Sequence, residues 1–526
     1  MSTRTLFLFT ALFAMSTRIP LFFTALLVVL GTIVGSTAIG STPAAEPSKT
    51  AEPPTTTGRK PNIVFILADD LGYRELGCYG QKLIRTPRID GLASQGMRLT
   101  QHYSGNAVCA PSRCVLMTGM HPGHAWIRNN RSAKPEGQEP IPADTTTLAE
   151  LLRQQGYATG AFDKWGLGPP GSEGDPLRQG FDRFFGYLCQ GHAHSYYPEY
   201  LWDNDRRIRL NNHPPVPGHA SLPDDADAGD PREYDRFKGQ DYAPDRINEQ
   251  ALAFIRANRD KPFFLYYPTI IPHVALHVPD EELQPYLELG WRDPPFTGRP
   301  RRGYTPHFTP RAAYAAMISR LDRNVGRVLD LLDELGLADN TIVVFTSDNG
   351  TTHLKQEVDY DFFASVGELR GLKGSLHEGG VRVPAIVRFP GRVAPGTTDE
   401  RVSGFEDWMP TLLDLIGDAS ATPKGIDGIS FAPTLLGRPQ EPRPFLYREF
   451  SGYGGQQSIR VGDWKAIRTN MNRGNRTLEL YNLADDPSER RNVAGQHPET
   501  VEKLETLMRR EHVRSDIFPL MPIDGE

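Results

Sequence analysis

Two stretches of the chain consist almost wholly of apolar residues, many of them β-branched. Asn62–Ala68 reads NIVFILA, and Thr341–Ser347 reads TIVVFTS. A strand stays apolar on both faces when both faces of its sheet are covered, as in a parallel sheet flanked by helices. Tyr157–Asp163 and Pro262–Tyr267 are further predicted strands. Such strands require a central sheet with helices on both sides.

Helices are predicted between these strands. Over 310–336, apolar residues recur at three- and four-residue steps, which indicates a long amphipathic helix. Shorter helices are predicted for 87–97, 145–155, 244–258 and 406–416. The alternation predicts an α/β fold, with a large mixed, mostly parallel sheet sandwiched by helices.

The pattern changes after a Pro- and Gly-rich stretch that ends near Arg443. Ser458–Arg468 and Thr477–Leu483 are predicted to be strands, and Glu499–Arg510 a helix. We expect residues 441–526 to form a smaller subdomain with an antiparallel sheet and one helix.

A long insertion, Gln190–Asp241, has little periodicity but many aromatic residues. Long loops of this kind are commonly functional, and its aromatic side chains are predicted to line a substrate wall. The rings expected in this wall are Tyr196, Tyr197, Tyr200 and Trp202, with packing inside the protein as the alternative.

The N-terminus has the layout of a secretory signal peptide. Arg18 precedes the apolar run Ile19–Val34, and small residues follow through Ala45. The run is short for a spanning helix, so no stable membrane insertion is expected. We predict a signal peptide over 1–45, a Pro- and Thr-rich linker over 46–60, and a secreted or periplasmic protein.

Charge and cysteine content exclude some classes of protein. The net charge of −6 gives no electrostatic basis for binding nucleic acid. Four cysteines in 526 residues are too few to hold a secreted chain of this size together by disulfides.

Polar residues follow the two apolar strands directly. Asp69 and Asp70 follow the first strand, and Asp348 and Asn349 follow the second. The carboxyl ends of parallel strands meet at one edge of a sheet, where open α/β sheets bind ligands. Four oxygen ligands without Cys or His fit a hard cation, namely Ca²⁺, with Mg²⁺ as the alternative.

The segment Cys109–Gly119 reads CAPSRCVLMTG. Pro111 suits the first turn of a helix and Gly119 its end, so Cys109 is expected at the positive end of a short buried helix. Arg113, one turn later, adds a fixed charge with several donors. The alternative is a buried cysteine that only packs in the core.

The Cys-x-Pro-Ser-Arg pattern followed by Leu-x-Thr-Gly resembles the signature of type I sulfatases, in which this cysteine is oxidised to Cα-formylglycine. Matching motifs occur in the family's order from about residue 60 to about residue 500. They are ADDLG at Asp69, the Cys109 signature, Gly160–Gly168, Pro272–His273, TSDNG at Asp348, LRGLKG at Lys373 and ELYNLADDP at Glu479. The resemblance implies an alkaline-phosphatase-like fold, with residues 61–440 as the catalytic domain.

The resemblance also implies a mechanism and its partners. A maturation enzyme would generate formylglycine from Cys109, and one hydroxyl of its hydrate would attack sulfur. The metal ligands would be Asp69, Asp70, Asp348 and Asn349. Arg113, Lys164 and Lys373 would hold the sulfate, and His273 would protonate the leaving oxygen. The implied substrate is a sulfated carbohydrate or an aryl sulfate, and the four aromatic rings of the insertion would stack on the sugar.

One position departs from the family pattern. The family commonly has Lys-Trp-His, whose histidine is the expected base for sulfate release, whereas this chain has Lys164-Trp165-Gly166. Glycine cannot accept a proton. His192, His194 and His353 are the candidates for a replacement base or a substrate contact.

Two other functions are compatible with these motifs. A phosphate or phosphonate monoesterase would use the same scaffold, since sulfate and phosphate esters share a shape. A catalytically silent glycan-binding protein would account for Gly166.

Overall fold

The structure is a computed structural model that describes residues 58–298 and 303–525. The predicted signal peptide, and all but the last three residues of the predicted linker, lie outside this part of the chain. None of the described helices is long and apolar enough to cross a membrane.

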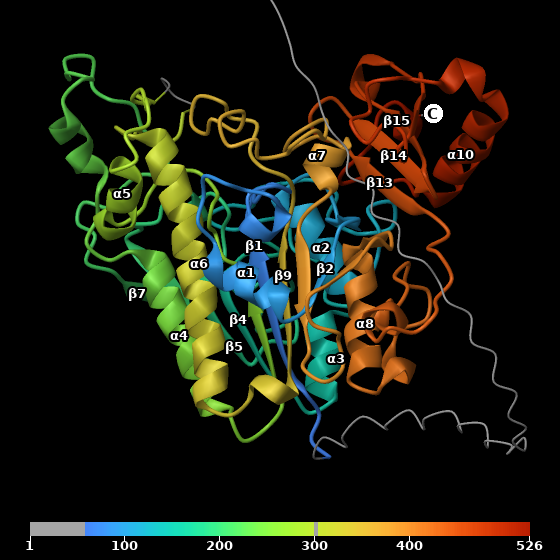
Figure 1. Ribbon diagram of the computed structural model, residues 1–526, viewed down its shortest axis with the longest axis horizontal. Coiled ribbons are helices and arrows are strands. Elements are labelled where there is room, and N and C mark those ends of the chain that lie inside the picture. The colour runs from blue at the N-terminus through green and yellow to red at the C-terminus, as the bar shows by residue number, and fades with distance from the viewer. Residues whose placement is uncertain (1–57, 299–302, 526) are drawn as a thin grey trace, which may run out of the picture. The chain divides into compact units, whose positions relative to one another are not determined.

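A ten-stranded sheet forms the centre of the fold, in the order β11-β2-β10-β9-β1-β8-β4-β5-β6-β7 (Figure 1). Its middle is parallel: β1 (Asn62–Ala68) pairs with β9 (Thr341–Ser347) on one side and with β8 (Phe263–Tyr267) on the other. β4 (Ala158–Lys164) and β5 (Arg183–Tyr187) continue it in parallel. The fold class predicted from the alternating pattern is confirmed.

Shorter strands complete both edges. β10 (Ala385–Arg388) runs antiparallel to β9 and to β2 (Met97–Leu99), and β11 (Thr397–Asp399) lies parallel to β2. On the opposite edge, β6 (Tyr200–Asp203) and β7 (Arg206–Arg209) form an antiparallel hairpin. A separate parallel pair joins β3 (His102–Tyr103) to β12 (Ser403–Gly404).

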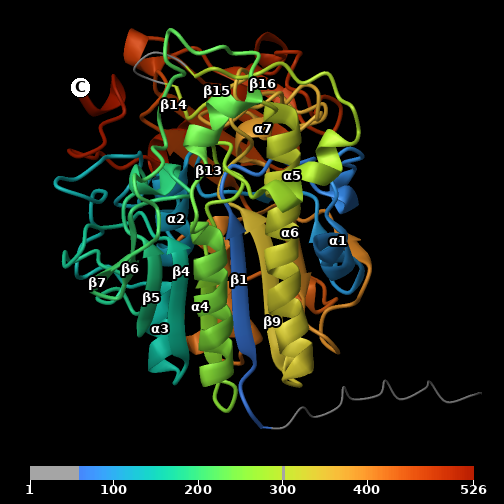
Figure 2. The same ribbon diagram turned by 90° about the vertical axis from the view of Figure 1, so that its left-hand side faces the viewer.

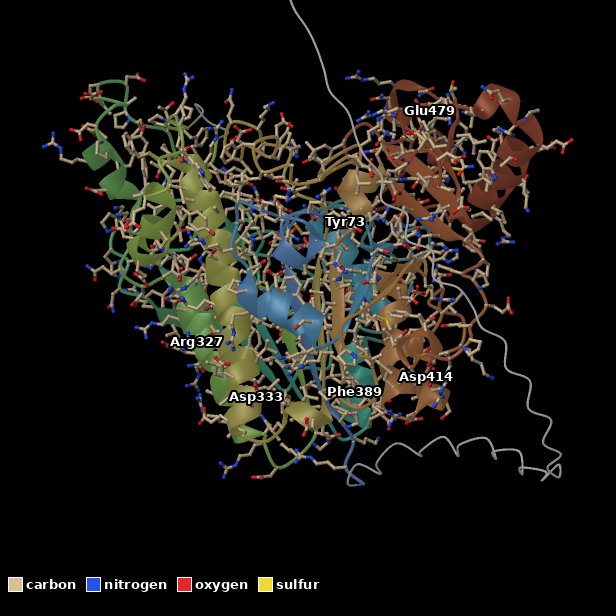
Figure 3. All side chains as sticks on the ribbon, viewed as in Figure 1. Tyr73, Arg327, Asp333, Phe389, Asp414 and Glu479 are labelled. Atoms are coloured by element: carbon tan, nitrogen blue, oxygen red, sulfur yellow. The ribbon has the colours of Figure 1, made fainter. Side chains whose placement is uncertain are left out.

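Helices cover both faces of the sheet, as the apolar strands require. Val64 and Ile66 of β1 pack in the core beneath α1 (Pro87–Ser94), α4 (Ala243–Ala257) and α6 (Pro310–Glu334). Ile63 and Phe65 face the core beneath α2 (Cys109–Thr118), α3 (Leu148–Gln154) and α8 (Trp408–Leu415). Figure 2 shows α4 and α6 in front of the strands, and Figure 3 marks the two layers by Asp333 on α6 and Asp414 on α8.

A four-stranded antiparallel sheet follows in the C-terminal part of the chain. It contains β13 (Leu446–Phe450), β14 (Gln456–Val461), β15 (Trp464–Arg468) and β16 (Glu479–Asn482), with α10 (Pro498–Glu511) against β14 and β15. The predicted strand segment Ser458–Arg468 is thus a hairpin. Its two-residue turn places Gly462 at a φ of +56°, which favours glycine.

The remaining short helices are α5 (Asp280–Leu287), α7 (Glu378–Val381) and α9 (Ala432–Leu435). One predicted boundary was wrong, because the helix expected over 87–97 ends at Ser94 and Met97 opens β2. Gly96 explains the change of direction. A Cβ at this glycine would lie 2.3 Å from the carbonyl oxygen of Val387, so the backbone passes directly against β10.

Most aromatic side chains of the insertion lie inside the protein. Tyr196, Tyr197 and Trp202 are buried, and the Tyr196 hydroxyl donates to the carbonyl oxygens of Ile270 and His273. Packing therefore accounts for these three rings, and the prediction that they stack on sugars was wrong. Tyr200 is half-buried, with the guanidinium of Arg207 4.4 Å from its ring centre.

Candidate active site

The residues that follow β1 and β9 meet at the carboxyl edge of the sheet. Ala68 and Ser347 are paired in register, so Asp69 and Asp70 lie beside Asp348 and Asn349. The Asp70 backbone N–H donates to Oδ1 of Asp348 at 3.2 Å, and the Asn349 amide donates to Oδ1 of Asp70 at 2.7 Å. All four side chains are buried. The predicted meeting of the two acidic pairs is thus seen in the structure.

This cluster fits a cation. Oδ1 of Asn349 is buried and has no hydrogen-bond partner, which leaves an oxygen ligand available. Single ligand atoms of Asp69, Asp70, Cys109 and His273 also lie within 4.8 Å of one another. Burial and the charge of Asp69 raise the pKa of Asp348 to about 6, although the charges of Arg113 and Lys164 oppose this shift.

Cys109 is the first residue of α2, after Val108 in extended conformation. Its Sγ lies 3.4 Å from Oδ1 of Asp69 and 3.7 Å from Nζ of Lys373. Burial and the Asp69 charge raise the pKa of the Cys109 thiol to about 12. Because the thiolate is the nucleophilic form, unmodified Cys109 is poorly suited to attack at neutral pH.

Three cationic side chains surround Cys109. The Arg113 guanidinium donates to Oδ2 of Asp348 at 2.8 and 3.0 Å, and to the carbonyl oxygen of Lys164. Nζ of Lys164 lies 2.5 Å from Oδ2 of Asp69, and Nζ of Lys373 lies 2.8 Å from Asp70. Burial alone would raise the pKa of Asp69, but these positive charges keep that pKa far below its usual range.

The charges of this group balance. Three carboxylates, Asp69, Asp70 and Asp348, face three cations. A divalent cation would add two positive charges, which would free the lysines to bind an anion. The arrangement is therefore suited to an anionic ligand in the presence of a metal.

His273 lies at the rim of the cluster. Its Nε2 is 3.7 Å from Oδ2 of Asp70, and its Nδ1 contacts the carbonyl oxygen of Val274. Since a carbonyl oxygen only accepts, Nδ1 carries the proton of the neutral ring. Burial and the charge of Lys373 lower the pKa of His273 well below its usual value, so the ring is neutral at rest.

The loop that carries Lys373 is held by the C-terminal sheet. Gln456 on β14 donates to the carbonyl oxygen of Gly374 at 2.7 Å and accepts from the N–H of Leu376 at 3.0 Å. Nζ of Lys465 on β15 lies 2.9 Å from Oε1 of Glu378 in α7. Two strands of the small sheet thereby fix the position of this loop.

Gln190 occupies the space that a side chain at position 166 would fill. Gly166 has a φ of +79°, and a Cβ there would lie 2.9 Å from Nε2 of Gln190. Gln190 is buried, and its Nε2 has no hydrogen-bond partner. An amide does not accept a proton at neutral pH, so Gln190 provides no base at this place. Sequence reasoning did not identify Gln190, because the contact joins the loops after β4 and β5.

The three candidate histidines lie in different surroundings. His192 contacts Tyr187, Tyr200 and Glu136, and burial lowers its pKa to about 4. His353 is exposed and packs edge-on against Tyr453. His194 stacks on His273, with ring centres 5.0 Å apart and planes 9° from parallel. The stacking of His194 thus places it beside His273, at the rim of the cluster.

His219 and Tyr304 lie beside His194 and His273. His194 forms a 2.8 Å hydrogen bond with His219, and the Tyr304 ring contacts His194, His219 and His273. Neither residue was identified from the sequence, because no recognisable motif contains them.

All four cysteines of the chain are free thiols.

Comparison with known families identifies two matching models. The Sulfatase model matches residues 61–418, and the model of the C-terminal part of N-sulphoglucosamine sulphohydrolase matches residues 372–514. Together they span both sheets.

Several characterised proteins are similar over most of their length. An N-acetylgalactosamine-6-O-sulfatase of Bacteroides thetaiotaomicron is 33% identical over 510 residues, covering 86% of this chain and 93% of that protein. Human arylsulfatase A is 31% identical, covering 85% and 87%. The crystal structure of Ps i-CgsB in complex with k-i-k-neocarrahexaose superimposes with a TM-score of 0.69 at 26% identity, covering 89% of this chain and 96% of that one.

Proposed function

The chain belongs to the sulfatase family, whose members hydrolyse sulfate esters, and we propose that it acts on a sulfated carbohydrate by means of an oxidised Cys109 and a divalent cation. The carbohydrate is supported by two relatives, one named for N-acetylgalactosamine 6-sulfate and the other bound to neocarrahexaose. An aryl sulfate is the simplest alternative substrate.

Asp69, Asp70, Asp348 and Asn349 would hold the cation, with Ca²⁺ as the first candidate and Mg²⁺ as the second. The unpartnered Oδ1 of Asn349 and the charge balance of the cluster support this assignment. The bound cation would lower the pKa of a nearby hydroxyl and neutralise sulfate oxygens.

Cys109 would act as the precursor of Cα-formylglycine, whose hydrate would supply the attacking oxygen. The raised thiol pKa supports this role, since unmodified Cys109 is a weak nucleophile. Cys109 is 1% exposed in the fold. The maturation enzyme would therefore need to reach this segment before α2 packs into the core.

Arg113, Lys164 and Lys373 would bind the sulfate oxygens and stabilise the charge that develops on them. Their number matches the three carboxylates, so the cation would make the site net positive. His273 would protonate the leaving oxygen, with Lys373 assisting. Because His273 is neutral at rest, the negative charge of bound substrate would have to raise its pKa for this step.

Sequence evidence alone supports two further proposals. The layout of residues 1–45 supports export to the periplasm or the exterior. The change of pattern near Arg443 supports a catalytic domain over 61–440 and a C-terminal subdomain over 441–526.

The observation that carries the proposal is the position of Cys109, at the start of α2 and within 3.7 Å of both Asp69 and Lys373. The test is mass spectrometry of the peptide that spans Cys109, after co-expression with a formylglycine-generating enzyme. We expect the mass of the aldehyde or its hydrate. An unmodified thiol in active enzyme would contradict the mechanism.

Activity assays separate the alternatives. We expect 4-nitrophenyl sulfate to be hydrolysed in preference to 4-nitrophenyl phosphate, and Cys109→Ala to abolish turnover. Cys189→Ala, which removes a half-buried thiol outside the cluster, is the matched control and should stay active. A strong preference for phosphate would favour the phosphate or phosphonate monoesterase, and glycan binding without turnover would favour the silent homologue.

A further inference from the structure

Three aromatic side chains, two from the insertion and one from the loop before α6, form a group beside His273. They are His194, His219 and Tyr304, with ring centres 4.4 to 5.8 Å from their neighbours in this group. The Asp70 carboxylate lies 3.7 Å from Nε2 of His273. This histidine wall therefore borders the place where the leaving group of the ester would lie.

The hydrogen bonds of the wall fix where the ring protons are. Nδ1 of His219 lies 3.2 Å from the carbonyl oxygen of Gly303, which can only accept, so Nδ1 of His219 carries its proton. In this tautomer, Nε2 of His219 is an acceptor. It lies 2.8 Å from Nδ1 of His194, which must therefore donate. Nε2 of His194 is left without a proton, as a hydrogen-bond acceptor.

The neutral form of His194 is favoured by its surroundings. Burial, the neighbouring His273, and the charges of Lys164 and Lys373 lower the pKa of His194 well below its usual value. The His194 side chain is half-buried, so it is partly accessible from the solvent.

We propose that Nε2 of His194 determines substrate specificity by accepting a hydrogen bond from a hydroxyl or amide N–H of the sugar that bears the sulfate, and that His219 is the positioning residue that fixes this tautomer. The inference rests on the proposed function, and it concerns the sugar rather than the ester. Its geometric basis is the stacking of His194 on His273, beside the leaving group.

The chemistry of the acceptor excludes other partners. Sulfate oxygens carry no proton and would be repelled by the lone pair of Nε2, so they belong to Arg113 and the two lysines. An unsubstituted aryl sulfate has no donor beside its ester and leaves this acceptor unused. A site that hydrogen-bonds a substrate group discriminates against analogues that lack the group, because its own polar atom is then unpaired.

The first test compares two substrates. We expect His194→Ala to lower kcat/KM for N-acetylgalactosamine 6-sulfate by roughly tenfold or more, mainly through KM, as for the loss of one good hydrogen bond. Turnover of 4-nitrophenyl sulfate, which offers no donor to Nε2, should fall by a clearly smaller factor. His213→Ala, an exposed histidine of the same insertion, is the control and should change neither. Equal losses on both substrates, or no loss on the sugar, would overturn the proposal.

The second test addresses His219. Its role predicts that His219→Gln, whose amide oxygen can accept from Nδ1 of His194, keeps more selectivity for the sugar than His219→Leu. If both variants behave alike, His219 does not position His194.

A binding measurement separates this inference from the proposed function. Calorimetry with Cys109→Ala enzyme needs no turnover and uses N-acetylgalactosamine 6-sulfate and inorganic sulfate as probes. Adding His194→Ala should weaken binding of the sugar sulfate while leaving that of inorganic sulfate unchanged, and unchanged binding of both would overturn the role of His194. Wild-type enzyme that hydrolyses neither substrate would instead overturn the proposed function.

Discussion

At the scale of single residues, burial sets the chemistry. Cys109, Asp348 and His273 each lie in the buried cluster, and each has a pKa displaced toward its neutral form. Arg113 and the two lysines keep their charge there because carboxylates lie beside them. The cluster thus combines groups of shifted pKa with fixed positive charges that can bind an anion.

Removal of one proposed metal ligand should weaken the response to calcium. Wild-type protein is expected to unfold at a higher temperature in the presence of Ca²⁺, because a ligand that binds only the folded state stabilises it. Asn349→Ala should need at least about tenfold more Ca²⁺ for the same increase in unfolding temperature, since one of four protein oxygen ligands is lost. Thermal unfolding across a calcium titration measures this effect.

Asp427→Asn is the control for that titration. Asp427 belongs to a second cluster, with His121, His124 and Glu511, whose polar groups hydrogen-bond to one another. Its loss should leave the calcium response intact. If the calcium response disappears in Asp427→Asn but persists in Asn349→Ala, the cation binds at the Asp427 cluster and the proposed metal site is wrong.

His102 should make the fold sensitive to acid. It is buried between Ser403 and Trp408, and burial lowers its pKa to about 3 despite the nearby charge of Glu406. Below the unfolded pKa of about 6.5, the unfolded chain binds a proton that the folded chain does not. Stability is therefore complete above that pH and falls below it, by about 2 kcal/mol at pH 5 from this group.

Urea unfolding of His102→Gln at pH 5 and pH 7.5 checks this prediction. The variant should lose about 2 kcal/mol less than wild type between the two pH values. His213→Gln, at an exposed position, should follow wild type. An unchanged pH dependence in His102→Gln would contradict the assignment.

At the scale of elements, a buried charge network joins the start of α8 to the C-terminal sheet. Arg448 on β13 makes two hydrogen bonds of 2.9 and 3.0 Å to Glu406, and Arg443 makes a third of 2.9 Å. Burial opposes the charge of Glu406, but the two arginines lower its pKa to about 2. The network is fully desolvated, so each charge depends on its partners.

Arg448→Met should therefore destabilise the protein by about 3 kcal/mol, because it leaves a buried carboxylate with one of its two partners. Denaturant unfolding measures the change. The double variant Arg448→Met/Glu406→Leu removes both charges and should be more stable than the single variant. A single variant within about 1 kcal/mol of wild type would show that the pair matters little.

At the scale of the whole molecule, the candidate site is assembled from three kinds of element, which lie far apart in the sequence. The parallel strands supply Asp69, Asp348 and Lys164, helix α2 supplies Cys109, and a loop held by the small sheet supplies Lys373. The small sheet consequently supports the candidate active site, although it contributes no residue to the cluster.

Gln456→Leu tests this dependence. Without its two hydrogen bonds to the loop, Lys373 should be less well positioned, and we expect kcat/KM to fall by roughly tenfold. Ser458→Ala, a buried residue on the same face of β14, is the matched control and should retain activity. Equal activity in both variants would show that the loop holds its position unaided.

The sequence was sufficient for what depends on local pattern. The run Asn62–Ala68 predicted a strand with two covered faces, and Ile63 and Val64 indeed face separate cores. The acidic pairs were predictable because parallel strands bring their carboxyl ends to one edge. Where a pattern was weaker, as at Met97, the boundary was wrong, because the approach of Gly96 to β10 is a tertiary contact.

Only the tertiary structure determined the surroundings of the site. Gln190 fills the place of a side chain at Gly166, Tyr196 of the insertion packs in the core, and His219 hydrogen-bonds to His194. These contacts join loops that are distant in sequence and have no periodicity. Strand and helix patterns are properties of neighbouring residues, whereas a hydrogen bond between loops depends on where the sheet brings each loop, and no local pattern encodes that.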